Sequence, residues 1–460
     1  MRVDNLPRRD FLKTASLFAG AAAVAPEKTF AQDSADDVIL RFAVTCDTHF
    51  PGSFYPGFFP GNSQETQRSR LAKAIRLAVD YASAQPYDRL DAFAVCGDMT
   101  NRGVEEELVP FCETLDAALP ADTRRVLCMG SHEYMGGSRE LWEKNCKTPG
   151  NRRREIGGFQ FITLSPDDTC ETDGVYKNRL EWVERELEAA VAEGGPERPI
   201  FFFQHYHVTR PETPELLAAE PQWLKGRRTT RCHKGPQGAS DLFPIFEKFP
   251  QLIDFSGHSH YPISDPGVVW QGKFTLFGCG TLTYGKFLEP PYDTTPEDRY
   301  EYAQFYIVEV SRDFSVRLRI MDLPSESLIA REYRVERPAD PTCRPYSDAR
   351  IETFPTPVWG PGAGLWRDER PSDGGSFRFP QAQNVEDVQS YRVVLVKKSE
   401  PEKIVAERLL WSKFYRNPQP DKITFSLTNL DSKTDYHMEV VPINFFGKQG
   451  ETPLTLDFTT

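Results

Sequence analysis

The sequence predicts an α/β domain over residues 36–335, followed by an all-β sandwich over residues 351–460. In the first part, short apolar runs alternate with longer stretches in which apolar residues recur at helical spacing. Beyond residue 375 only short alternating runs occur, which is typical of a β-sandwich. Six prolines between residues 338 and 361 separate the two patterns, and we assign a linker to residues 336–350.

Within the α/β domain, strands are expected at the apolar runs and helices at the stretches with one apolar stripe. The expected strands cover residues 38–45, 91–96, 125–129, 159–164, 199–203, 252–255 and 273–277. The expected helices cover residues 65–84, 105–119 and 180–192. A hairpin over residues 305–310 and 315–321 is expected to close the domain.

The N-terminus has the features of an export signal over residues 1–31. Arg8 and Arg9 precede Phe-Leu-Lys and an apolar run over residues 15–25, which is shorter than the ~20 residues of a membrane-spanning helix. The paired arginines resemble a twin-arginine signal, and an ordinary signal peptide that happens to carry them is the alternative. We therefore expect a bacterial protein that is periplasmic or secreted. No later run of 18 apolar residues occurs, so no stable membrane insertion is expected.

Charge and cysteine content restrict the partners. The formal net charge of −12 argues against a general nucleic-acid or anionic-membrane binder, because both need basic surface. The nine cysteines are an odd number, so at least one has no partner within the chain. Several end apolar runs, as Cys46 and Cys96 do, which favours buried, inert thiols over disulfides.

Aspartate and histidine side chains gather at the ends of the predicted strands. Asp47 and His49 lie two residues apart, and in extended backbone both side chains would point the same way. His258 and His260 repeat this spacing, and Asp98, His132 and His205 each follow another strand. The carboxyl ends of strands in an α/β sheet meet at one crevice. Asp-x-His or Gly-Asp alone is usually an ordinary turn, and Gly-His-x-His alone could equally be one or a metal site, but together the motifs predict a divalent-metal site.

In this order the motifs resemble the calcineurin-like metallophosphoesterase family. They are Asp47-x-His49, Gly97-Asp98, Gly130-Ser-His-Glu133, His205 and Gly257-His-Ser-His260. The resemblance implies a four-layer fold in which two packed β-sheets are flanked by helices. It also implies two divalent ions, either Mn, Fe or Zn, that share a hydroxide and clamp the phosphoryl group.

The resemblance further implies a role for each residue. The first ion would be held by Asp47, His49 and His260, the second by His205 and His258, and Asp98 would bridge the two. His132 would act near the leaving oxygen, with Glu133 setting its orientation. Ser131 stands where the family has a metal-ligating asparagine, so it would bind through a water or leave the second ion loosely held.

Other polar residues close to these motifs are weaker candidates. Asn101 and Arg102 could contact the substrate phosphate, and His207 could line the pocket, although each could equally be a solvated loop residue. The basic run at residues 152–154 could attract an anionic substrate, with a solvated turn as the alternative.

The C-terminal runs resemble a fibronectin type III domain, one kind of immunoglobulin-like sandwich. The segment from Leu430 to Gly447 carries the resemblance, which implies that Tyr436 forms the corner before a strand.

These motifs predict an exported phosphoesterase that hydrolyses a phosphomonoester or phosphodiester of a small molecule, lipid or sugar. A catalytically weak scaffold, whose sandwich binds a glycan or a protein partner, is the alternative. Because the predicted ligands all precede residue 261, we expect removal of the residues after 345 to leave an active enzyme.

Overall fold

The computed structural model describes residues 37–53, 61–167, 175–208, 240–287, 296–369 and 371–460. The predicted signal peptide lies outside these residues. Among the helices that are described, none is both long enough and apolar enough to cross a membrane.

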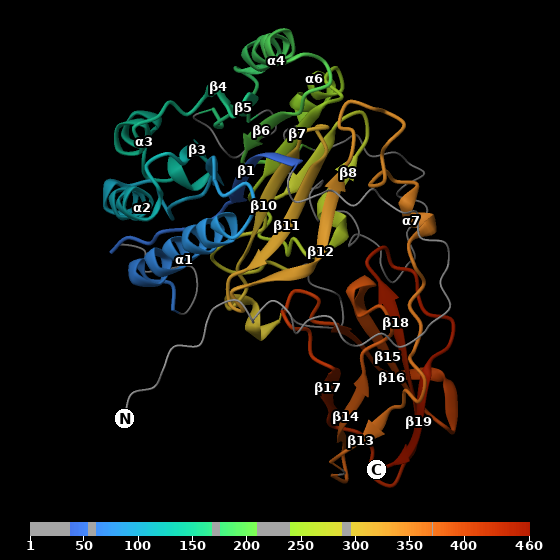
Figure 1. The fold of residues 1–460 in the computed structure, drawn as a ribbon. Coiled ribbons are helices and arrows are strands. Elements are labelled where there is room, and N and C mark those ends of the chain that lie inside the picture. The colour runs from blue at the N-terminus through green and yellow to red at the C-terminus, as the bar shows by residue number, and fades with distance from the viewer. Residues whose placement is uncertain (1–36, 54–60, 168–174, 209–239, 288–295, 370) are drawn as a thin grey trace, which may run out of the picture.

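Two six-stranded sheets form the first part of the chain (Figure 1). The first sheet has the order β12-β11-β10-β1-β2-β3, with bounds Ser327–Val335, Val316–Asp322, Gln304–Ser311, Val38–Thr45, Ala92–Cys96 and Arg124–Cys128. The second has the order β4-β5-β6-β7-β9-β8, with bounds Arg152–Ile156, Phe159–Thr163, Ile200–Gln204, Leu252–Ser256, Thr275–Gly278 and Val269–Gln271. The helices are α1 (Gln64–Ser83), α2 (Glu105–Ala118), α3 (Arg139–Cys146), α4 (Leu180–Gly194), α6 (Phe243–Phe246) and α7 (Arg350–Thr353), with a 3₁₀ turn η2 at His132–Tyr134.

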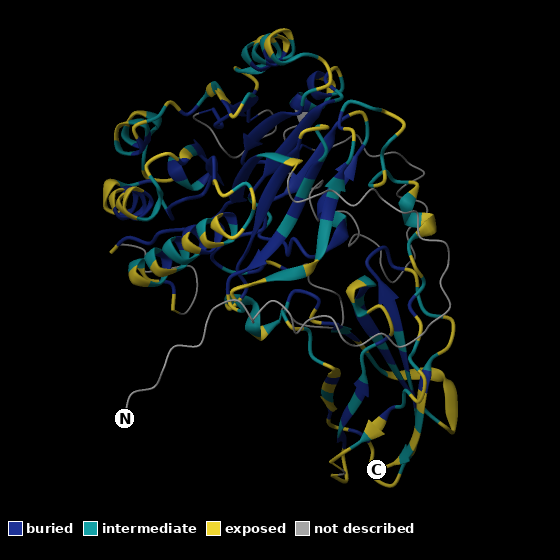
Figure 2. Cartoon of the chain, in the orientation of Figure 1, coloured by how far each residue is buried: buried dark blue, intermediate teal, exposed yellow. Residues whose placement is uncertain are grey.

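The core of this part lies between the two sheets, where every residue of β2, β5, β6, β7 and β10 is buried (Figure 2). On β1, Phe42 packs edge-on against the rings of Phe161 and Phe201 from the second sheet, with centroids 5.1 and 4.8 Å apart. Its neighbour Ala43 points the other way and packs beneath α1 and α2, because side chains alternate along a strand. Helices α4 and α6 cover the outer face of the second sheet. The predicted four-layer arrangement is confirmed.

Parallel strands point their carboxyl ends at one edge of each sheet. Strand β1 pairs in parallel with β2, and β2 with β3, while β5, β6, β7 and β9 are parallel in the second sheet. The predicted closing hairpin is β10 and β11, and it continues into β12. The basic run at residues 152–154 is not a turn but part of β4, where Arg153 pairs with Glu186 and Glu193.

The C-terminal part is a sandwich of two antiparallel sheets. One has the order β13-β14-β17 and the other β16-β15-β18-β19, with bounds Trp366–Arg367, Gly375–Pro380, Lys422–Leu427, Glu400–Trp411, Val388–Lys397, Asp435–Asn444 and Leu454–Thr459. Tyr436 is fully buried, and its hydroxyl accepts a hydrogen bond from the Asp431 amide at 2.9 Å. This is the tyrosine corner that the sequence predicts.

Candidate metal centre

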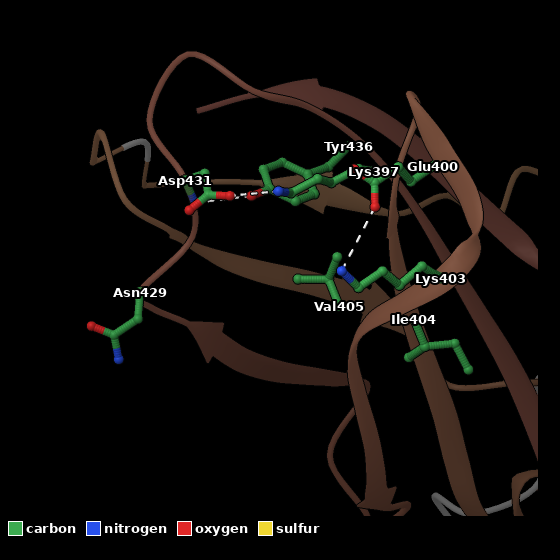
Figure 3. A pocket seen from close by; sticks show the side chains of 8 residues that line it. All are labelled: Lys397, Glu400, Lys403, Ile404, Val405, Asn429, Asp431 and Tyr436. Carbon is green, nitrogen blue, oxygen red and sulfur yellow. Dashed lines mark hydrogen bonds and ion pairs between the residues drawn. The ribbon is translucent and has the colours of Figure 1, made fainter.

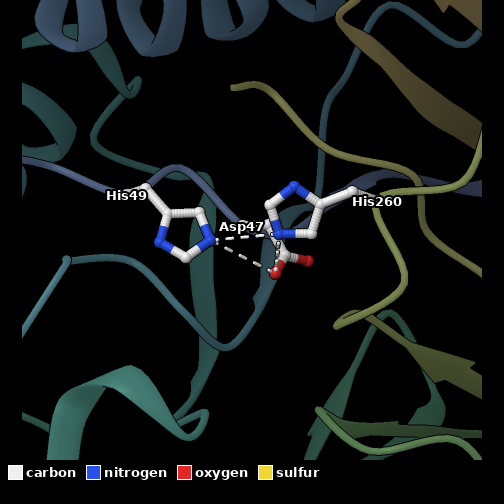
Figure 4. Close-up of side chains that lie close together, drawn as sticks. All are labelled: Asp47, His49 and His260. Atoms are coloured by element: carbon white, nitrogen blue, oxygen red, sulfur yellow. Dashed lines mark hydrogen bonds and ion pairs between the residues drawn. The ribbon is translucent and has the colours of Figure 1, made fainter. Parts of the chain in front are cut away.

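The first group of ligand atoms belongs to Asp47, His49 and His260 (Figure 4). His260 Nε2 lies 3.0 Å from Asp47 Oδ1 and 3.1 Å from His49 Nε2. His49 Nε2 lies 3.6 Å from the same Asp47 oxygen. All three residues are buried. Asp47 and His49 follow β1, and His260 follows β7, so the two sheets meet at this point.

Asp98 takes part in two further groups. One contains Asp98, His205 and His258, and the other contains His49, Asp98 and His132. His205 Nε2 lies 3.0 Å from Asp98 Oδ2, and His132 Nε2 lies 3.8 Å from the same oxygen. The three groups overlap at His49 and Asp98, so Asp98 has the position expected of a bridging ligand.

Left-handed backbone at the strand ends turns these side chains inward. Asp47, His49, Asp98, His258 and His260 all have φ between 45° and 70°, a region that non-glycine residues rarely occupy. The expectation of extended backbone at Asp47 and His49 is therefore wrong. Their side chains converge because the chain bends sharply after β1. Such strain persists only where surrounding contacts fix it, and it is common at functional sites.

The glycines of two motifs are required by close packing around the site. A Cβ on Gly97 would lie 2.6 Å from His205 Nδ1, and one on Gly257 would lie 2.8 Å from Asp47 Oδ2. Any side chain at either position would displace a ligand residue. The Gly97-Asp98 and Gly257-His258 motifs therefore need glycine at their first position for steric reasons.

Backbone carbonyls fix the tautomers of three histidines. His260 Nδ1 lies 3.2 Å from the Tyr284 carbonyl, His205 Nδ1 lies 2.9 Å from that of Cys96, and His132 Nδ1 lies 2.8 Å from that of Asn101. A carbonyl can only accept, so Nδ1 carries the hydrogen in each ring. In the neutral ring, the Nε2 lone pair then faces the centre, as metal-ligating histidines require.

Two buried atoms test whether a cation fits. Neither Asp47 Oδ1 nor His205 Nε2 makes a hydrogen bond within the described part of the chain. Each nevertheless lies 3.0 Å from another electron-rich atom of the site. Buried polar atoms without partners are costly, and a divalent cation would satisfy all of these lone pairs at once. The donor set of carboxylate and imidazole fits such an ion.

Electrostatics in the metal-free site keep the carboxylates charged. Burial raises the pKa of Asp47 and of Asp98, but the neighbouring histidines outweigh it, and both pKa values are lowered. Burial lowers the pKa of His205, yet the negative charge of Asp98, 3.0 Å away, raises that pKa to about 10. Burial lowers the pKa of His49 and of His258 to about 4. A metal ion would thus replace a proton on His205 and meet neutral rings at His49 and His258.

The loop after β3 places Ser131, His132 and Glu133. Ser131 Oγ lies 3.4 Å from both carboxylate oxygens of Asp98. The predicted role of Glu133 in orienting His132 is wrong, because its buried carboxylate accepts hydrogen bonds from the amides of Asp98, Thr100 and Gly130 instead. The Asn101 carbonyl orients His132. Burial and the charge of Asp98 raise the pKa of Glu133 to about 7.

The weaker candidates lie close to the site. Asn101 is fully buried, and neither atom of its side-chain amide has a partner among the described residues. His207 is also buried, with Nδ1 2.8 Å from Ser256 Oγ and its ring centroid 6.3 Å from that of His258. Neither is a solvated loop residue. Arg102 is only partly buried, and its guanidinium lies 3.4 Å from the Met135 carbonyl.

The segment after β9 supports the first group and was missed from the sequence. The hydroxyls of Thr281 and Thr283 donate to the Asp47 carbonyl, and the Tyr284 ring lies 4.5 Å from that of His260. These residues carry no metal-ligand motif. Their only sequence signal is their position directly after a strand.

A separate cleft lies on the C-terminal sandwich (Figure 3). Its volume of about 250 Å³ is below the usual range of small-molecule sites. Its charged groups pair with one another, since Lys397 contacts Asp431 and Lys403 lies 3.7 Å from Glu400. The cleft therefore offers little unpaired charge to a ligand.

A family model matches the part of the chain that contains the metal centre. Residues 40–262 match the family model described as calcineurin-like phosphoesterase. No curated protein matches the chain. A purple acid phosphatase from yellow lupin seeds is 14% identical, with a TM-score of 0.41, over 66% of this chain and 55% of that one. The fibronectin type III domain of human collagen XX is 23% identical, with a TM-score of 0.18, over 24% of this chain and 93% of that one. The region from residue 40 to 262 is thus a calcineurin-like phosphoesterase domain, and this metal-dependent phosphoric ester hydrolase also carries a two-sheet β-sandwich.

Proposed function

We propose that this protein is an exported phosphoesterase that hydrolyses a phosphomonoester or phosphodiester at a dinuclear metal site. The observation that carries the proposal is the overlap of the ligand groups at Asp98. Asp47, His49 and His260 would hold one ion, and His205 and His258 the other. When bound, the ions supply Lewis-acid polarisation of the phosphoryl oxygens and activation of the attacking water.

Each carboxylate is anchored by one oxygen and offers the other. Asp47 Oδ2 accepts a hydrogen bond from the His258 amide at 3.0 Å, while Oδ1 faces His49 and His260. Asp98 Oδ1 accepts from the His132 amide at 2.9 Å, while Oδ2 faces His205. The backbone therefore holds both carboxylates in place before any ion arrives, which lowers the cost of ordering them on binding.

In this proposal, His132 protonates the leaving oxygen. Its Nδ1–H donates to the Asn101 carbonyl, so Nε2 faces the centre, and its side chain keeps 16% exposure. A substrate can therefore reach Nε2, and a protonated ring would donate from that atom.

Replacing His132 with alanine should test this role. We expect turnover of alkyl phosphate esters to fall by roughly 10²–10⁴-fold, because a poor leaving group needs the proton. The loss should be much smaller for aryl esters, whose leaving groups depart with little protonation. The measurement is kcat for a matched pair of alkyl and aryl esters. Equal losses for both would show that His132 is not the acid.

Ser131 decides how firmly the second ion is held. Its hydroxyl lies beside Asp98 but is a weak ligand, so we expect metal titration to give one tight and one weaker site. Ser131→Asn should restore an amide oxygen and tighten the weaker site. A tenfold gain corresponds to about 1.4 kcal/mol. Calorimetric titration measures it, with Ser131→Ala as the matched control. Weaker binding in Ser131→Asn would mean that the pocket is built around serine and a water.

Metal removal tests the proposal as a whole. We expect a chelator to abolish hydrolysis across a panel of nucleotide, sugar and lipid phosphate esters, and Mn²⁺, Fe²⁺ or Zn²⁺ to restore it, because the ligands suit all three. Metal analysis of the same samples gives the number of ions. Full turnover in metal-free protein would contradict the proposal. A protein that binds metal but hydrolyses no ester on the panel would favour the scaffold alternative.

A further inference from the structure

Two cysteines on neighbouring helices face each other away from the metal centre. Cys112 lies on α2, and Cys146 is the last residue of α3. Their Sγ atoms are 3.5 Å apart, and both side chains are buried. A disulfide needs an S–S distance of about 2.05 Å, so the two sulfurs would have to approach by roughly 1.5 Å. Rotation of the two side chains can supply a movement of this size.

The other neighbouring thiols of the core differ in their access to solvent. Cys96 and Cys279 have Sγ atoms 3.8 Å apart, but both are fully buried between the sheets. Cys46 and Cys128 are equally enclosed. Cys112, in contrast, keeps 7% of its surface exposed. Within the described part of the chain, Cys112 and Cys146 are thus the close pair that an external reagent can reach.

The charges around the pair favour attack by Cys112. The hydrogen bond with Cys146 lowers the pKa of Cys112, and the nearby Arg125 and Lys147 add to this, whereas burial and Asp116 oppose it. Burial raises the pKa of Cys146 well above its usual value. The thiolate is the nucleophile in thiol–disulfide exchange. Cys112 would therefore react first with the oxidant, and Cys146 would then attack the resulting mixed disulfide.

We propose that Cys112 and Cys146 form a disulfide that joins α2 to α3 once the protein is exported to an oxidising compartment. The Cys112 thiolate attacks a disulfide oxidant, forms a mixed disulfide and releases one oxidant thiol. Cys146 then loses its proton and attacks Cys112 Sγ, which releases the second oxidant thiol. The two cysteines lose two electrons and two protons, and the oxidant disulfide becomes a dithiol. The supply of the oxidant depends on the proposed export, whereas the close approach of the two thiols does not.

The bond would enclose a segment of the active site. The chain between Cys112 and Cys146 contains β3 and the loop with Ser131, His132 and Glu133. A cross-link at its two ends restricts the unfolded chain and so stabilises this segment. The sequence alone does not indicate this pair, because 34 residues separate the two cysteines and only the packing of α2 on α3 brings them together.

Peptide mapping of the exported wild-type protein, with free thiols alkylated at lysis, tests the proposal. We expect one linked peptide pair, Cys112 with Cys146, lighter by two hydrogens than the reduced pair. Cys96 and Cys279 should become alkylated only after denaturation, which provides an internal control.

Reduction should lower the melting temperature of the wild type by roughly 5–10 °C and leave that of Cys112→Ser unchanged. Cys343→Ser, at a cysteine with no thiol neighbour among the described residues, should keep the linked pair.

Two further samples separate this proposal from the proposed function. An Arg8→Lys, Arg9→Lys variant should stay in the cytoplasm with both thiols reduced, and glutathione disulfide should then link them in the purified protein. The readout is a mass and does not depend on hydrolysis, so loss of activity and loss of the cross-link are distinguishable. Free thiols at both positions in the exported wild type, or a bond from Cys112 to another cysteine, would overturn the proposal.

Discussion

Asp98→Asn is expected to remove nearly all metal-dependent hydrolysis while leaving the fold intact. Asp98 belongs to two of the three ligand groups, and its Oδ2 lies 3.0 Å from His205 Nε2. Asparagine keeps the shape but loses the charge that would hold both ions. We expect kcat to fall by about 10³-fold or more, beyond the loss typical of a single hydrogen-bond donor. Metal titration of the variant should show weaker binding at both sites.

The fold should tolerate this change because asparagine can satisfy the same neighbours. Its Oδ1 can still accept from the His132 amide, and its Nδ2 can donate to His205 Nε2, which carries a lone pair in the neutral ring. Far-UV circular dichroism and the melting temperature of the metal-free protein measure this.

A matched control for Asp98→Asn is Asp254→Asn. Asp254 is also fully buried, on β7, and accepts a hydrogen bond from Gln204 at 3.1 Å, but it belongs to none of the ligand groups. Its pKa is raised well above the usual value by burial, so the change removes little charge. This control should keep its metal affinity. If Asp98→Asn binds two ions and turns over normally, Asp98 does not bridge them.

The positions of the ligands could be predicted from the sequence because they depend on strand ends. The strands that precede the ligands are short apolar runs, namely β1, β2, β3, β6 and β7. The residues that follow parallel strands lie at one edge of the sheet. The backbone at these ends could not be predicted in the same way. The left-handed φ of Asp47 and Asp98 occurs where segments far apart in the sequence pack closely, as His205 does against Gly97, and no local pattern records such contacts.

Supporting residues were predicted less well than ligands, for a physical reason. The family resemblance implied that Glu133 orients His132, whereas its carboxylate turns away to bind three backbone amides. Strand β16 is hard to predict because its first six residues are exposed and four of them, at 400–403, are Glu, Pro, Glu and Lys, a pattern that resembles a loop. Contacts with backbone atoms, and strands at solvent-facing edges, do not require particular residue types. The sequence therefore gives little indication of them.

The C-terminal sandwich packs against the segment that supports the first metal group. Phe287, which follows this segment, lies between the rings of Trp411 and Tyr415, with centroids 5.5 and 4.5 Å away. The Lys286 amide donates to the His260 carbonyl at 2.9 Å, and the Tyr284 carbonyl accepts from His260 Nδ1. A short stretch of chain thus connects a metal ligand to an apolar interface with the sandwich.

Polar contacts reinforce this connection. Gln389 of the sandwich donates to Asp265 Oδ2 at 3.2 Å and to the hydroxyl of Tyr261, the residue after His260, at 3.4 Å. Gln304 donates to the Tyr415 carbonyl at 3.1 Å. The expectation that the chain can lose all residues after 345 therefore needs revision. That cut would expose Phe287 and remove the contacts that hold the segment before it.

We accordingly expect truncation after residue 345 to weaken the first metal site, and Trp411→Ala to do so without removing the domain. The affinity for the first ion should fall by roughly 10–100-fold in Trp411→Ala, the scale typical of changes behind a metal ligand. Calorimetric titration measures the affinity. Ile404→Ala, an exposed apolar residue on the same strand, is the matched control and should bind as the wild type does. A Trp411→Ala protein with a lower melting temperature and unchanged metal affinity would show that the interface stabilises the sandwich alone. If Trp411→Ala weakens metal binding and Trp411→Phe restores it, the packing of Phe287 positions His260. The sandwich is then part of the catalytic architecture.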